Sequence, residues 1–166
     1  MSAFAPLAAL LLAAAAPAPS VALLPLEPLG TGFEQAVEMQ GAVRVSLAAL
    51  EGLRVLDEDA TRRALDEEPA LGACAEPQCL ARVAQLLGVD FVVTGVVGGL
   101  GGFRSLVLKR SDRLGKVVAT VNEALSDEWR QQVPGLVRAA MESVPRAPAP
   151  ALALQAPEAP RRPEWR

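Results

Sequence analysis

A helix that runs through a glycine into a long apolar strand is the feature that most constrains the fold of this chain. Apolar residues recur at i, i+3, i+4 and i+7 from Leu80 to Leu87, which places them on one helix face. Gly88 follows at a position where a left-handed C-cap is favoured, because glycine has no Cβ. Nearly every side chain from Phe91 to Val97 is apolar, which predicts a central strand covered on both faces.

The remaining periodicities predict one mixed sheet with helices packed on it. Further strands are expected over Val21–Leu26, Leu53–Leu56, Phe103–Arg110 and Lys116–Ala124. Helices are expected over Phe33–Leu50, Ala60–Glu67 and Pro77–Leu87, with a last one after Ser126. The order β-α-β-α-α-β-β-β-α indicates an α/β (α+β) fold with a single sheet of about five strands. Pro25 cannot donate to a ladder, so the first strand should lie at an edge or end there.

Several single residues refine these elements. Gly41 either weakens the first helix by ~1 kcal/mol or permits close packing against a neighbour. Asp57 or Asp59 can cap the second helix. Pro134 either kinks the last helix or marks a start one turn late. The predicted apolar stripe of the first helix consists of Phe33, Ala36, Val37, Val43, Leu47 and Leu50.

The two ends of the chain differ from the middle. Residues 1–20 carry no charged side chain, and the apolar run Leu7–Ala16 has about half the ~20 residues that span a bilayer. We therefore expect a signal peptide cleaved before Val21 and no transmembrane span, the alternative being an Ala/Pro-rich leader of a cytoplasmic protein. Residues 145–166 contain six prolines, which predicts a disordered Pro/Ala-rich tail after a domain over residues 21–144.

Cys74 and Cys79 are the only two cysteines in the chain. Their C-x4-C spacing differs from the C-x-x-C of thiol oxidoreductases, and the chain has no histidine to complete a zinc site. In an exported protein a local disulfide would join the loop to the start of the following helix. In a cytosolic protein both residues would be free thiols.

The residues offer little for catalysis. The glycines from Gly95 to Gly102 lead into another strand rather than a helix, so a hairpin is favoured over a phosphate loop. The absence of histidine excludes Ser-His-Asp and Cys-His arrangements. The carboxylates of Asp57–Asp59 and Glu67–Glu68 suit a helix start and a solvated face, and Asp90 suits a turn better than a general base. We expect no catalytic residue, no cofactor and no metal.

Charge argues against nucleic acid as a partner. The net charge is −3, with acids and bases interspersed. A nucleic-acid footprint would need a basic stripe. The one basic cluster, Lys109–Arg110 with Arg113, flanks a predicted turn instead.

Three stretches together suggest a family. Val21-Ala22-Leu23-Leu24-Pro25-Leu26, then Cys74-x4-Cys79-Leu80-Ala81, then Leu87-Gly88-Val89-Asp90-Phe91-Val92-Val93-Thr94-Gly95 resemble exported TolB-like/CsgG-type domains. The resemblance implies a small α/β fold like the N-terminal domain of TolB. Members act as envelope assembly or adaptor modules, among them curli secretion subunits, activators of penicillin-binding proteins and flagellar outer-membrane components. Curli-type and activator members are usually lipoproteins, whereas this chain has no cysteine at its predicted cleavage region.

The function expected from these observations is that of a non-enzymatic adaptor. The chain would be exported to the periplasm or the outer membrane and would bind an envelope protein there, a homo-oligomer being compatible with this role. The alternative is a small-ligand-binding or regulatory domain that uses the glycine-rich hairpin. A third hypothesis, an enzyme using Asp90 or the Asp57–Asp59 cluster, requires a carboxylate with a strongly raised pKa in a cleft.

Overall fold

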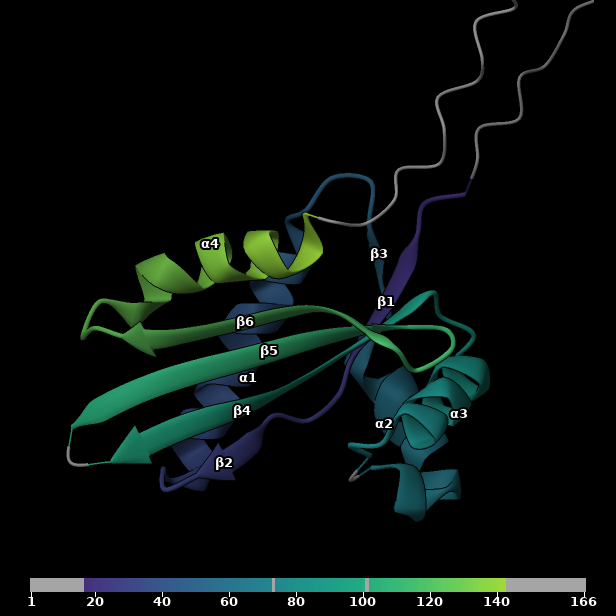
Figure 1. Ribbon diagram of the computed structural model, residues 1–166, viewed down its shortest axis with the longest axis horizontal. Helices are drawn as coiled ribbons and strands as arrows, with labels where there is room; N and C mark the ends of the chain where they lie inside the picture. Colours follow the sequence, from purple (N-terminus) through teal and green to yellow (C-terminus); the bar gives the residue numbers. More distant parts are fainter. Residues whose placement is uncertain (1–16, 73, 101, 143–166) are drawn as a thin grey trace, which may run out of the picture.

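The fold is built on a single β-sheet. The computed structural model describes residues 17–72, 74–100 and 102–142 (Figure 1). Its strands are β1 (Ser20–Leu23), β2 (Glu27–Leu29), β3 (Arg54–Val55), β4 (Phe91–Leu100), β5 (Phe103–Asp112) and β6 (Val117–Leu125). Its helices are α1 (Phe33–Ala48), α2 (Glu58–Glu67), α3 (Pro77–Leu87) and α4 (Trp129–Met141), with a 3₁₀ turn over Pro69–Leu71. Most of the predicted leader and all of the predicted tail lie outside the described residues.

The sheet is mixed, as predicted. Its order is β3-β1-β4-β5-β6, with β2 pairing further along β4. β1 pairs in parallel with β3 and β4, while β4, β5 and β6 form an antiparallel meander. The sheet has six strands rather than the predicted five or so, because Glu27–Leu29 forms a short strand. This strand pairs with β4 beyond the end of β1, along the same edge. Pro28 hid this strand from the sequence reading, since proline is rare within a ladder.

Helices cover the two faces of the sheet unequally. α1 and α4 pack together over one face and bury the larger core, which includes Val43, Leu106 and Val133. α2 and α3 cover the other face only near β1 and the start of β4, where Ala22, Val83 and Val92 pack (Figure 1). The rest of that second face, along β4, β5 and β6, has no helix over it among the described residues; we call it the open face.

Several local predictions hold. Gly88 ends α3 in the left-handed region at φ 62°, and Asp57 caps α2 by accepting hydrogen bonds from the amides of Asp59 and Ala60. The glycine-rich stretch does lead from one strand into a hairpin partner. The predicted end of the strand is wrong, however, because β4 continues through Gly98 and Gly99 to Leu100. Gly98 lies against the Ser105 side chain, whose hydroxyl would have to move to admit a Cβ.

Other predictions are corrected by the packing. The strand ends before Pro25, as one of the two predicted alternatives stated, whereas the other alternative, an edge position, is wrong because β1 lies between β3 and β4. Phe33 and Val37 are exposed, because α1 presents the side of Ala36, Met39 and Val43 to the core. Pro134 lies inside α4, which begins at Trp129, so a start after the proline is wrong.

No helix within residues 17–72, 74–100 and 102–142 combines the length and the hydrophobicity needed to cross a bilayer.

Candidate functional site

Asp90 joins the first strand to the centre of the sheet. Its Oδ2 accepts hydrogen bonds from the Ser20 amide at 2.8 Å and from Ser20 Oγ at 2.7 Å. Its own amide donates to the Ser20 carbonyl at 3.0 Å, and Arg113 Nη2 lies 2.9 Å from Oδ1. Burial alone would raise the Asp90 pKa, but the Ser20 hydrogen bonds and the charges of Arg113 and Arg54 lower it below the ordinary 3.8. A general base with a raised pKa is therefore not found here.

Replacing Asp90 with asparagine is expected to lower the free energy of unfolding at pH 7 by about 1 kcal/mol, since a third of the side chain is exposed and solvent screens its charge. The lowered pKa means that the carboxylate stabilises the fold above its unfolded pKa and stops doing so as pH falls through the folded value. The difference between the two proteins should therefore shrink below about pH 4. Urea titrations from pH 3 to pH 7 measure this, with exposed Asp66→Asn as the control. A constant difference across that range would contradict the proposed charge effect.

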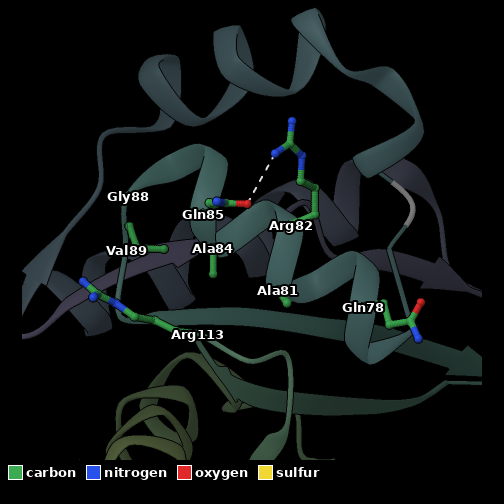
Figure 2. A pocket seen from close by; sticks show the side chains of 8 residues that line it. All are labelled: Gln78, Ala81, Arg82, Ala84, Gln85, Gly88, Val89 and Arg113. Atoms are coloured by element: carbon green, nitrogen blue, oxygen red, sulfur yellow. Dashed lines mark hydrogen bonds between the residues drawn. The ribbon is translucent and has the colours of Figure 1, made fainter.

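A groove runs along α3, beside Asp90. It has a volume of about 670 Å³ and is lined by Gln78, Ala81, Arg82, Ala84, Gln85, Gly88, Val89 and Arg113. Figure 2 shows Ala81 and Ala84 pointing from α3 toward the strands, with Gln78 and Arg113 at opposite ends. Arg82 points away from the strands and donates to Gln85 Oε1 at 3.3 Å (Figure 2) and to Glu68 Oε1 at 3.0 Å. Both arginines of the groove are thus already paired with carboxylates of this chain.

The two cysteines lie at the N-terminal end of α3. Their Cα atoms are 5.5 Å apart, and the structure joins Cys74 to Cys79. Such a bridge ties the loop after the 3₁₀ turn to the first turn of α3, as anticipated for an exported protein. Oxidation in the cell stays a prediction, which the intact mass of the isolated protein with and without reductant tests.

The other carboxylates considered for catalysis do not gather in a cleft. Asp57 is occupied as the cap of α2, and Glu68 is paired with Arg82. In the described part of the chain, no three His, Cys, Asp or Glu side chains are placed to hold a metal ion.

Four large and strongly exposed apolar side chains gather instead at one end of the molecule. Leu29 ends β2, Phe33 begins α1, and Leu100 and Phe103 face each other across the β4–β5 turn. Their exposed fractions are 65%, 75%, 83% and 80%. Figure 1 shows the end of β4, the start of β5, the end of β2 and the start of α1 at the same end, opposite the end where the chain enters β1. We call these four residues the apolar end.

Glycines allow the two segments of the apolar end to touch. A Cβ on Gly30 would lie 2.5 Å from the Gly99 carbonyl oxygen, and a Cβ on Gly99 would lie 2.8 Å from the Thr31 side chain. Both distances are too short for any residue with a side chain. The β2–α1 loop therefore packs directly on the backbone of β4 and holds Leu29 and Phe33 beside the hairpin tip.

The notch between these segments is small. Gly30, Gly99, Leu100 and Phe103 are among the residues that line it, and its volume is about 190 Å³. Small-molecule sites commonly measure about 300–1,000 Å³. The notch thus gives little support to the alternative of a ligand site at the glycine-rich hairpin, and the flanking side chains form a protruding surface rather than a cavity.

Comparison with known proteins supports the fold. No protein-family model and no curated protein matches the chain. Among solved structures, the chain is similar to the C-terminal domain of LpoB from Escherichia coli, with 13% identity over 66% of this chain and 84% of that one (TM-score 0.56). It is also similar to lipoprotein GNA1162 from Neisseria meningitidis, with 16% identity over 75% of this chain and 98% of that one (TM-score 0.56).

A third similar structure is TolB from Acinetobacter baumannii, with 17% identity over 75% of this chain and 28% of that one (TM-score 0.51). The predicted resemblance to a TolB-like envelope domain is thereby confirmed for the fold. At such identities the likeness carries no activity or partner over to this chain.

Sequence reasoning missed the apolar end. Leu29 and Phe33 are separated from Leu100 and Phe103 by about seventy residues, so no local pattern joins them. The available signal was the glycine pair Gly98–Gly99 inside a strand pattern, which is typical of a close approach of another backbone.

Proposed function

We propose that this chain is a non-enzymatic adaptor of the cell envelope that binds a protein partner through its apolar end. The observation that carries the proposal is the clustering of four large apolar side chains, each at least 65% exposed, on a tip that glycine contacts hold together. Contiguous exposed apolar patches on soluble domains are typical of interaction sites. The TolB-like fold and the leader expected from the sequence support an envelope location.

The proposal predicts that the apolar end is needed for binding but not for folding. Replacing Leu100 and Phe103 with serine should abolish crosslinking of the full chain to its partner in the native envelope. The substitutions would remove the apolar groups that the partner buries in the complex. Each is at least 80% exposed in the free protein, so the unfolding free energy should change by no more than about 0.5 kcal/mol per substitution.

Leu114→Ser is the matched control for this experiment. Leu114 is 80% exposed, as Phe103 is, but it lies in the β5–β6 loop at the other end of β5. Its replacement should leave the crosslinked product unchanged. Equal crosslinking by the Leu100/Phe103 variant and the native chain would contradict the proposed site.

A further inference from the structure

Acidic side chains lie on the elements that form or flank the apolar end, on both faces of the sheet. Those on the neighbouring ends of β2, α1, β6 and α4 are Glu27, Glu34, Glu38, Glu123, Asp127 and Glu128. The basic residues there are Arg104 and Arg130, and each is already ion-paired, with Asp127 at 3.6 Å and with Glu38. The six acids and two arginines give this end a formal charge of −4, compared with −3 for the whole chain.

Only some of these acids lie at helix N-termini, where the helix dipole favours negative charge. Glu34 lies in the first turn of α1, and Glu128 is the N-cap residue of α4, where negative charge is favourable. Glu27 and Glu123 lie on strands, and no helix end explains them. Glu27 pairs with Val96, which places it on the same sheet face as Leu29, two residues further along β2. Glu27, which has no ion pair with a described residue, thus borders Leu29 directly.

The open face continues from the apolar end and gives a partner room to bind. Val96 and Val107 pair across β4 and β5 on this face, in line with Leu100 and Phe103, and both are half-buried. A stable interface commonly buries about 800 Å² on each partner. We therefore include the adjoining sheet surface in the proposed interface.

We propose that the partner presents a surface that is apolar at its centre and basic at its rim. This inference rests on the proposed function and adds the chemistry of the partner. Lysine or arginine side chains at the rim would face Glu27 and Glu34, while apolar groups at the centre would cover Phe103 and Leu100. The same acids repel a membrane of anionic lipid, so the geometry favours a basic protein surface over a lipid surface.

The test uses the full chain with p-benzoylphenylalanine in place of Phe103, photo-crosslinked in the native envelope. The crosslinked peptide, identified by mass spectrometry, should carry Lys or Arg next to the apolar residue that reacts. Removing two negative charges beside the apolar end with Glu27→Gln and Glu34→Gln should lower the crosslink yield about threefold or more. In the chain that keeps both glutamates, raising the salt from 0.05 M to 0.5 M should lower the yield by a similar factor.

Glu51→Gln with Glu67→Gln is the matched control. Both residues are exposed, lie away from the apolar end, and change the net charge by the same amount. This pair should leave the yield unchanged. Circular dichroism of both double variants confirms folding.

The outcomes separate this inference from the proposed function. If the Leu100/Phe103 serine variant loses the partner crosslink, but neither salt nor the Glu27/Glu34 substitutions change the yield of the position-103 crosslink, the basic rim is overturned and the adaptor function stands. Absence of a protein crosslink at position 103, or an equal yield from a probe placed at Glu51, overturns both. Co-sedimentation of the full chain with phosphatidylglycerol vesicles would overturn the inference in favour of a lipid surface.

Discussion

Replacing Gly115 with alanine is expected to lower the free energy of unfolding by about 3 kcal/mol or more. Gly115 lies in the β5–β6 loop at φ 75°, and its Cα packs directly on α3. A Cβ there would overlap the Pro77 carbonyl oxygen and lie 2.9 Å from the Ala81 amide nitrogen. These are backbone atoms of a helix, so they cannot move aside as a flexible side chain could. Urea denaturation of the variant measures the loss.

Gly52→Ala separates strain from overlap. Gly52 has nearly the same backbone conformation, at φ 74°, but an added Cβ would meet no atom within 4 Å. Its replacement should therefore cost only the left-handed backbone strain of about 1 kcal/mol. Equal losses for the two variants would show that the loop does not depend on its contact with α3.

Replacing Arg110 with methionine is expected to raise the free energy of unfolding by about 2 kcal/mol. Arg110 is 1% exposed on the α1/α4 side of β5, and its Nε and Nη1 are buried without a hydrogen bond to any described residue. Its guanidinium lies 5.0 Å from the centre of the Phe91 ring, a contact that offsets only part of the desolvation cost. Burial lowers the pKa of Arg110 for the same reason.

Methionine keeps the length and the apolar stem while removing the charge. Arg113→Met is the control, because Arg113 is exposed and paired with Asp90, so its loss should give no gain. Thermal or urea unfolding of the two variants measures the difference. A loss of more than about 1 kcal/mol for Arg110→Met would mean that the buried guanidinium has an acceptor whose contribution exceeds the desolvation cost.

The elements that could be predicted are those specified by neighbouring residues. Gly88 after an amphipathic turn predicts the end of α3, and the apolar run from Phe91 predicts β4, because each signal is local. The side of α1 that faces the core could not be predicted, since Phe33 and Val37 fit the apolar spacing as well as Ala36 does. Only packing against α4 and the sheet distinguishes them.

The candidate site was harder to predict than the fold. The glycines of the hairpin indicated a turn, but their contact with Gly30 depends on β2 pairing with β4, which Pro28 concealed. The burial of Arg110 is likewise set by the sheet, because β5 places it next to Val93 and under α4. An arginine beside a lysine near a predicted turn is ordinarily exposed. Long-range pairing decided both cases.

The position of Ser20 has a consequence for how the leader expected over residues 1–20 can be removed. Ser20 is 3% exposed and holds the Asp90 carboxylate with two hydrogen bonds, and the carbonyl of Pro19 accepts from the Arg54 amide at 2.9 Å. A signal peptidase that cut between Ser20 and Val21 would delete both contacts and begin the mature chain inside β1. Once the domain has folded, that peptide bond is also out of a peptidase's reach. Cleavage before Val21 stays a prediction, and a cut in the alanine run before Pro17 would keep both contacts.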